Sequence, residues 1–216
     1  MGYQAESYLL PGGIGIKFKD HSVHNLHELQ NLPIIECDLS DLESFDLNYL
    51  NKEKISSLIL PNRTELPFSE LNSFRLTRLK AVKARSSDFG SLSDHPLEIL
   101  ELPDSLVKDI GFCENMPLTK LDFSGAQISK FPLFRKSKIT NLNLFKTRIE
   151  EISDFDCDTL EEIVLSGSPV RSIEFLTDAK KLLKVEIRAT AVSDLSPLSN
   201  SPIKELYLPG SQVNSI

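Results

Sequence analysis

The sequence predicts an α/β-type repeat solenoid, a coil of about ten similar turns in which short parallel strands form one face. The first observation is an apolar pattern that is clearest at 160–176, LEEIVLSGSPVRSIEFL. Relative to Leu160 as the anchor, apolar residues follow at offsets +3, +5, +10, +13 and +16. The pattern recurs with a period of about 21 residues, and self-similarity at such a period is the sequence signature of stacked repeats.

The second observation is that the pattern runs through almost the whole chain. Its anchors are residues 13, 34, 55, 76, 97, 118, 139, 160, 182 and 203, so the steps are equal except that from 160 to 182, which is one residue longer. Residues 1–12 do not fit and are expected to be an N-terminal flank or cap before an array at 13–216. The last repeat stops at offset +13, which predicts that a C-terminal cap is missing.

The third observation is that each repeat has two halves with different periods. Offsets +3 and +5 alternate with polar residues, as in KLDF (120–123) and NLNL (141–144), which indicates a strand with one buried face. Offsets +10, +13 and +16 are three residues apart, which fits a short 3₁₀ or extended return better than an α-helix. Successive strands are therefore expected to be parallel and about 4.8 Å apart.

The anchors and spacing resemble the leucine-rich repeat, L-x-x-L-x-L-x-x-N-x-L-x-x-L-x-x-L, over residues 13–216. The chain is most similar to the short 21–22-residue repeats of internalin-like and related bacterial proteins, as LSGSPVRSIEFL (165–176) and IRATAVSDLSPL (187–198) illustrate. This resemblance implies a right-handed superhelix with a parallel β-sheet on the concave face. It also implies short 3₁₀ or extended returns on the convex side.

One position departs from the family pattern. At offset +8 the family usually carries Asn, which links the backbones of adjacent coils. Here the later repeats carry mainly hydroxyls or Ala, at Ser105, Ala126, Thr147, Ser168, Thr190 and Ser211. The first four carry His21, Leu42, Arg63 and Ala84. Hydroxyls can bond backbone groups more weakly, so we expect the first four repeats to be less regular.

Composition excludes several classes of protein. The formal net charge of −7 and the pI near 5.2 argue against a general nucleic-acid or anionic-membrane binder. The sequence has no membrane-spanning apolar run and no signal peptide, so a cytoplasmic location is expected if the N-terminus is native. Three cysteines are an odd number and argue against a disulfide framework. Cys37 and Cys113 fall on core offsets, where a reduced Cys acts as a small hydrophobe.

The sequence contains three candidate motifs for metal, calcium or nucleotide binding, and none is interpreted as a binding site. A histidine trio spaced by three, His21, His24 and His27, is interpreted as exposed turn residues rather than as a metal site. Asp154, Asp156 and Asp158 lack the Gly and Glu of a calcium loop. GGIGIK (12–17) precedes a strand and is read as a turn, not as a nucleotide loop. We therefore expect no enzyme activity, no metal and no cofactor.

The open face of the sheet carries the candidate binding residues. Offsets +2, +4 and +6 point away from the core, and a solvated face has no need of large apolar residues there. Aromatic and Arg residues are also enriched at protein-binding hot spots. The predicted partner-binding residues are Ile59, Arg78, Lys80, Val82, Ile99, Glu101, Asp122, Asn143, Phe145, Val164, Glu186, Arg188 and Tyr207. An unused face is the competing interpretation, since single exposed apolar residues are ordinary and β-branched residues suit strands.

These observations predict a non-catalytic scaffold that binds another protein, of unknown identity, on its concave face. The alternative is a regulatory or targeting segment of a larger bacterial signalling enzyme or secreted effector, because similar bacterial arrays accompany kinase and other signalling domains. The apolar layer of the last repeat also predicts self-association through the uncapped C-terminal end.

Overall fold

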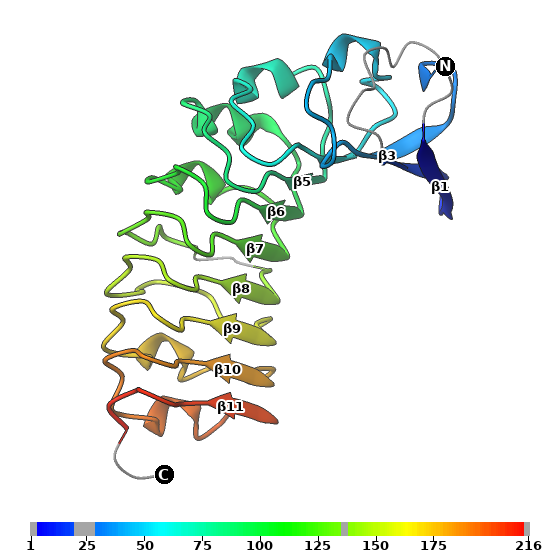
Figure 1. Cartoon of the computed structure of the whole chain (residues 1–216). Coiled ribbons are helices and arrows are strands. Elements are labelled where there is room, and N and C mark those ends of the chain that lie inside the picture. Colours follow the sequence, from blue (N-terminus) through cyan, green and yellow to red (C-terminus); the bar gives the residue numbers. More distant parts are fainter. Residues whose placement is uncertain (1–3, 20–28, 135–137, 214–216) are drawn as a thin grey trace.

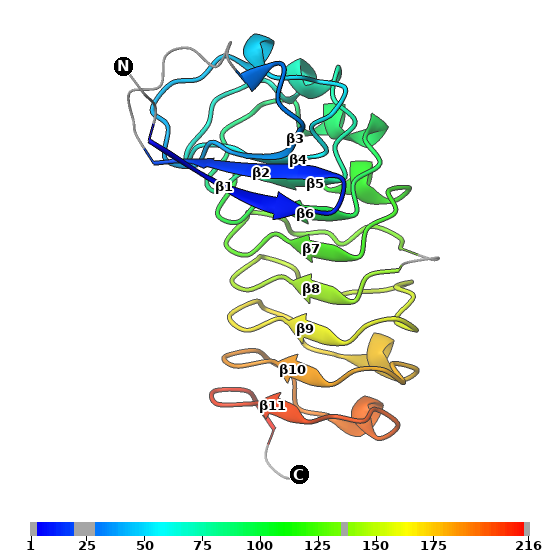
Figure 2. The same cartoon turned by 90° about the vertical axis from the view of Figure 1, so that its right-hand side faces the viewer.

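The strands of the chain form one sheet along the inner side of an arc-shaped coil (Figure 1). The computed structural model describes residues 4–19, 29–134 and 138–213. The 11-stranded sheet follows sequence order from β1 to β11; β1 is antiparallel to β2 and each later pair is parallel. Between successive strands from β3 to β11 the chain turns back along the outer side of the arc, and Figure 2 shows the open face of the sheet. The predicted solenoid, with its parallel sheet on the concave face, is confirmed.

The strands are short. They are β1 (Ala5–Leu10), β2 (Gly13–Phe18), β3 (Ile34–Asp38), β4 (Ser57–Ile59), β5 (Arg78–Lys80), β6 (Ile99–Glu101), β7 (Lys120–Asp122), β8 (Asn141–Asn143), β9 (Glu162–Val164), β10 (Lys184–Glu186) and β11 (Glu205–Tyr207). The outer returns carry short 3₁₀ helices. These are η2 (Leu47–Tyr49), η3 (Phe68–Leu71), η4 (Phe89–Asp94), η5 (Gly111–Cys113), η6 (Glu174–Leu176) and η7 (Ser196–Leu198).

The register of the sheet has the period of the sequence. Leu58 pairs with Leu79 and Leu79 pairs with Leu100, so each residue meets its equivalent in the next repeat. Ile163 pairs with Val185 across the one longer step. Since η6 keeps its usual offsets and ends at Leu176, the extra residue of that step lies in the return at 177–181. The strands therefore keep one common register through the inserted residue.

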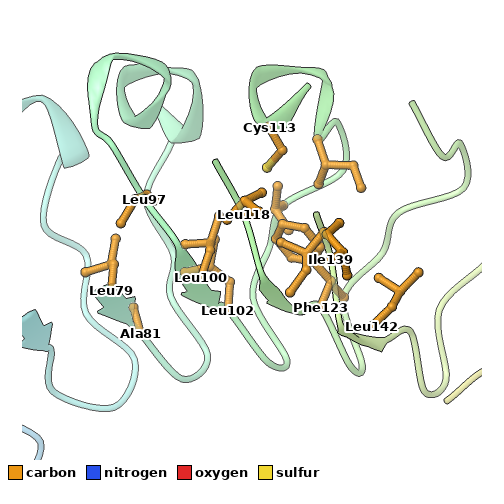
Figure 3. Packing of buried hydrophobic residues seen from close by; sticks show 14 of the residues in the cluster. Leu79, Ala81, Leu97, Leu100, Leu102, Cys113, Leu118, Phe123, Ile139 and Leu142 are labelled. Atoms are coloured by element: carbon orange, nitrogen blue, oxygen red, sulfur yellow. The ribbon is translucent and has the colours of Figure 1, made fainter. Parts of the chain in front are cut away.

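The apolar offsets form a continuous core between the sheet and the outer returns (Figure 3). Leu100, Leu121 and Leu142 are successive partners in the sheet and are each at most 1% exposed. Burying each such side chain contributes about 1.5–3 kcal/mol. Cys37 and Cys113 are buried in the same core, as predicted, and burial raises the pKa of the Cys37 thiol to about 12. That thiol is therefore neutral and acts as an apolar group.

A tight turn follows each strand from β5 to β10 and links neighbouring coils. The N–H at offset +7 donates to the +6 carbonyl of the next coil, as Lys83 does to Pro103 at 2.8 Å and Gly167 to Arg188 at 2.8 Å. The residue at offset +7 has a positive φ in seven successive coils. These residues are Lys83, Asp104, Gly125, Lys146, Gly167, Ala189 and Gly210. The turn thus resembles type II, which places a left-handed residue at its third position.

The hydroxyls at offset +8 bond within their own coil. Thr147 Oγ1 donates to the Leu144 carbonyl at 2.9 Å, and Thr190 Oγ1 donates to the Ile187 carbonyl at 2.8 Å. The expected backbone-bonding role is confirmed, but its partner differs from that of the family Asn. The backbone ladder of the turns links the coils instead.

The turn after β4 contains one residue more than the other turns. Arg63 makes the ladder bond, to the Val82 carbonyl at 2.9 Å, and has a φ of 63°. Thr64 is buried and donates from its N–H to the Pro61 carbonyl at 3.2 Å. The assignment of Arg63 to the +8 position, where the family carries Asn, was therefore wrong. Thr64 takes that place, which is buried, and a lone guanidinium would be expensive to bury there.

The outer returns differ along the array in a way that the sequence did not predict. In the described residues, the returns of the coils anchored at 118 and 139 contain no 3₁₀ helix. Phe131, Phe134 and Phe155 fill this region, with ring centroids 5.2 Å apart for the first pair and 5.7 Å for Phe131 and Phe155. The greater regularity expected of the later repeats therefore holds for their turns but not for these returns.

The N-terminal flank adds an antiparallel strand to the sheet. The turn between β1 and β2 has Pro11 followed by Gly12 at a φ of 91°, as a type II turn requires. The turn that the sequence predicts for GGIGIK (12–17) is thereby confirmed. Leu9 stays 89% exposed, so β1 lengthens the sheet without burying that side chain.

The last described coil is less buried than the coils before it. Ile203, Leu206 and Leu208 are only partly buried, whereas Ile163 and Leu165 at the offsets of the latter two are 0% exposed. Among the described residues, no further coil packs against this layer.

Replacing Leu144 by Ala tests the layered core. Leu144 is 0% exposed, so truncation should lower the free energy of unfolding by about 2–5 kcal/mol in urea denaturation. The matched control is Phe145→Ala, which removes the neighbouring side chain from the open face and should cost about 1 kcal/mol or less. Equal losses from the two variants would contradict the assignment of the layer.

Acid should destabilise the fold through His95. This residue is 4% exposed, and its Nε2 has no hydrogen-bond partner among the described residues. Burial lowers the pKa of His95 below its ordinary value of 6.5, and the charge of Asp94 offsets only part of this effect. The unfolded chain therefore binds a proton that the folded chain resists, so stability is lost as the pH falls below about 6.5.

The measurement is the free energy of unfolding between pH 7.5 and 5.0, in the native chain and in His95→Gln. We expect the native chain to show the steeper fall, by up to about 1.4 kcal/mol per pH unit. Parallel pH profiles would show that His95 is not the group responsible.

Candidate functional site

Figure 2 shows the open face of the sheet, on which the strands lie side by side. Their register places the predicted partner-binding residues in parallel rows. The strands place most of them: Ile59, Arg78, Lys80, Ile99, Glu101, Asp122, Asn143, Val164, Glu186 and Tyr207. The turns after β5, β8 and β10 place Val82, Phe145 and Arg188. Because adjacent strands are about 4.8 Å apart, each row brings residues from successive coils into contact.

A chain of ion pairs crosses the face from β3 to β7. Arg78 Nη1 lies 3.5 Å from Glu36 Oε2, and Arg78 Nη2 lies 3.4 Å from Glu101 Oε2. Lys120 Nζ donates to Glu101 Oε1 at 2.9 Å. The Tyr8 hydroxyl donates to Glu36, which connects β1 to the same network. These side chains are held in place before any partner arrives.

Burial and charge fix the protonation of this network. Burial by itself favours the neutral form of Glu101, but the hydrogen bond from Lys120 and the surrounding positive charges outweigh it. The pKa of Glu101 therefore lies below its ordinary value of 4.5. Burial, together with the hydrogen bond to Glu36 and the charge of Glu36, raises the pKa of Tyr8 to about 12. Glu101 is 7% exposed, so it orients its neighbours more than it faces solvent.

A second ion-pair group lies on β8, β9 and β10. Lys184 Nζ lies 2.6 Å from Glu162 Oε1 and 3.1 Å from Glu186 Oε1. Asn141 Nδ2 donates to Glu162 Oε2 at 3.0 Å. Hydrogen bonds to both carboxylates raise the pKa of Lys184. The ammonium group is therefore charged and already paired.

A hollow of about 350 Å³ lies between the two groups, over β7, β8 and β9. The side chains around it are Lys120, Asp122, Asn141, Asn143, Glu162 and Val164. Asn143 Nδ2 donates to Asp122 Oδ2 at 3.1 Å. The hollow therefore offers carboxylate and amide groups beside one apolar wall. Such a lining is suited to polar backbone groups and a small apolar side chain.

Apolar and aromatic side chains stand between the charged groups. Phe145 is 38% exposed, and the Lys146 ammonium lies 4.9 Å from the centroid of its ring. The Arg188 guanidinium lies 4.5 Å from the Tyr207 ring centroid. Ile99 is half-buried. Cation–π pairs of this kind contribute about 0.5–1 kcal/mol at exposed sites and hold the rings in place.

Sequence reasoning missed most of the partners that organise the face. Glu36, Lys120 and Glu162 belong to the same +2 row as Arg78 and Lys184, but they do not stand out singly. The available signal was the alternation of opposite charges in the +2 and +4 rows at separations of about one repeat. Such residues are cross-strand neighbours once the register is known.

Other candidate sites have no support in the described structure. Over its described residues, the chain has no group of three His, Cys, Asp or Glu side chains placed to hold a metal ion. The trio His21, His24 and His27 lies outside the described residues. No described helix has the length and apolar content needed to cross a membrane.

Comparison with known proteins gives matches at the level of structure. No protein family and no curated protein matches the sequence. An internalin (InlF) of Listeria monocytogenes has a TM-score of 0.57 at 17% identity, over 92% of this chain and 74% of its own. Internalin C2 of the same species has a TM-score of 0.55 at 18% identity, over 90% and 80%. A leucine-rich-repeat protein of Leptospira interrogans has a TM-score of 0.57 at 17% identity, over 88% and 58%.

The identities are low, so these similarities establish the fold and nothing finer. They agree with the regular strand register and with the 3₁₀ returns on the convex side. The chain has the leucine-rich-repeat solenoid fold and is similar in structure to bacterial internalins.

Proposed function

We propose that this chain is a non-catalytic scaffold that binds a partner protein on its concave face. The observation that carries the proposal is an open sheet face on which partly exposed apolar and aromatic side chains lie between groups that are already ion-paired. Phe145, Val164 and Tyr207 supply apolar contact area. Leucine-rich-repeat folds typically bind proteins and are usually non-catalytic.

The energetic reason is preorganisation. Ordering a rotamer-rich side chain on binding costs about 0.5–1.5 kcal/mol. On this face Arg78, Lys120 and Lys184 are already held by carboxylates, and Arg188 lies against an aromatic ring. A partner therefore gains contact with these groups without ordering them.

The test is capture by the immobilised chain, compared between two matched double variants. Phe145→Ala with Arg188→Glu alters the concave face, and Leu133→Ala with Arg171→Glu alters the convex side. Each pair truncates one exposed apolar residue and reverses one exposed Arg. We expect the concave variant to bind the captured protein with an affinity at least tenfold lower, since a hot spot contributes about 2 kcal/mol or more to binding.

The convex variant should keep that protein, and both variants should melt close to the native chain. Equal capture of the protein by the two variants would show that the concave face is not the binding surface. Loss from the convex variant alone would move the binding surface to the returns.

The alternative proposal is that the array regulates or targets a larger bacterial signalling enzyme or effector, with the chemistry outside these residues. The Leptospira protein is longer than this chain, which spans 58% of it. A catalytic domain continuous with the native reading frame would favour this alternative. In that case the concave face is the surface that binds a regulatory or anchoring protein of the larger enzyme or effector.

We further propose that the last described coil takes part in self-association. Ile203, Leu206 and Leu208 are partly buried, whereas their equivalents in the preceding coil, Leu182, Val185 and Ile187, are 0% exposed. Contiguous exposed apolar surface on a protein usually marks an interface.

Sedimentation velocity over a range of concentrations tests this second proposal. We expect the mass of the native chain to rise with concentration, and Leu206→Lys with Leu208→Glu to remain monomeric. The control is Leu133→Lys with Leu32→Glu, which alters two exposed apolar residues elsewhere. A native chain that is monomeric at all concentrations would refute self-association.

A further inference from the structure

A second hollow lies on the edge of the solenoid where the turns follow the strands. It has a volume of about 470 Å³. Its lining residues are Arg63, Lys83, Arg85, Asp104 and Leu106. They come from the turns after β4, β5 and β6, at one border of the concave face. We refer to Arg63, Lys83 and Arg85 as the cationic edge.

The backbone of the cationic edge is fixed by bonds between coils. Arg63 N donates to the Val82 carbonyl at 2.9 Å, and Lys83 N donates to the Pro103 carbonyl at 2.8 Å. Arg85 N donates to the Thr64 carbonyl at 2.8 Å. The three side chains are exposed, but each begins from an anchored backbone position. Their spacing is therefore set by the coil.

Two of these cations lie at the turn position that has a positive φ. Arg63 has a φ of 63° and Lys83 a φ of 56°. The equivalent position holds glycine in three other coils and Asp104, Lys146 or Ala189 in three more. The turn therefore accepts a side chain at this position, and Arg63 and Lys83 extend from it toward solvent.

The charges of the cationic edge are not neutralised within the described structure. None of its three residues forms a salt bridge with a described carboxylate, whereas Arg78 and Lys120 on the concave face are both paired. Asp104 lines the hollow, but its carboxylate leans over Gly125 of the following coil. A positive patch therefore remains on a chain of net charge −7.

The lining also includes an apolar contact. Leu106 is 50% exposed, and its N–H is bonded to the Ala84 carbonyl at 3.0 Å. No aromatic side chain lines the hollow, so the stacking platform typical of single-stranded nucleic-acid sites is missing from it. The pairing of three cations with a leucine matches a carboxylate-rich peptide that carries an apolar residue.

We propose that the cationic edge binds an acidic segment of a partner protein, with an apolar residue of that segment seated on Leu106. The carboxylates of the segment pair with the guanidinium and ammonium groups. Charge complementarity favours this occupant, because three cations that are unpaired in the described structure lie close together on a chain whose net charge is −7. The surface is separate from the concave contacts proposed above.

The same edge predicts the spacing within the segment. Arg148 is exposed three coils beyond Arg85. Three coils span about 14 Å, which an extended chain covers in about four residues. A segment that engages both the cationic edge and Arg148 therefore has two acidic clusters about four residues apart, with the apolar residue between them.

Fluorescence anisotropy with a dye-labelled twelve-residue peptide tests the proposal. The probe has two Glu/Asp clusters flanking a central Leu, and its control replaces every acid by Gln or Asn. Arg63→Gln with Lys83→Gln and Arg85→Gln should weaken binding of the acidic probe at least tenfold at low salt. The matched variant, Lys180→Gln with Lys181→Gln and Lys204→Gln, removes three exposed positive charges elsewhere and should change binding less than twofold.

Leu106→Ser supplies the second readout. It should weaken the probe with the central Leu about threefold or more and leave a probe with central Gly unchanged. Phe145→Ala with Arg188→Glu on the concave face should keep probe binding, which separates the two surfaces.

Three results would overturn the proposal: no binding of the acidic probe by the native chain, equal losses from the two triple variants, or tighter binding of a single-stranded oligonucleotide that depends on the same three residues. The first result would show that the edge does not bind acidic peptides. The second would show that binding depends only on the overall charge of the chain, and the third would show that the edge binds nucleic acid.

Discussion

Parallel pairing of each strand with its equivalent in the next repeat is the constraint on which the rest of this structure depends. It places Leu58, Leu79, Leu100, Leu121 and Leu142 in one buried row. Because a one-residue slip of a strand would turn its core side chains to the open face, this register is strongly specified. The residues at each of the remaining offsets of the repeat then form rows as well. The surface of the molecule is therefore a set of parallel rows of side chains, each with its own chemical character.

Most of the fold could be predicted from the sequence because the repeat period determines it. The buried row, the strand positions and the 3₁₀ spacing are repeated features, and the single longer step did not obscure them. Features that occur only once were not predictable in the same way. The extra residue in the turn at Pro61, the antiparallel strand β1 and the phenylalanine-filled returns near Phe131 each rest on local packing that has no counterpart in other coils.

The candidate site was predictable in part, for a related reason. Strand alternation identifies which side chains face outward, so the positions of Ile99, Phe145 and Tyr207 follow from offsets alone. It does not identify which outward charges pair, because that depends on rotamers and on diagonal neighbours. Arg78 meets residues of two different coils, at Glu36 and Glu101. Offsets alone identify Arg78 and Glu101 as outward residues but not that they hold each other in place.

The two proposed surfaces differ in electrostatic state, and this difference has physical consequences. On the concave face Arg78, Lys120 and Lys184 are paired, so a partner exchanges few counterions with them and its affinity depends mainly on apolar contact and shape. On the cationic edge the charges are open, so attraction extends over a Debye length, about 8 Å at physiological salt, and weakens as salt is added. Open charges raise association rates more than they lengthen residence times. A partner that uses both surfaces would be attracted by the charges of the cationic edge and retained by apolar contacts on the concave face. One solenoid can separate attraction from retention because the two surfaces are formed by different offsets of the repeat.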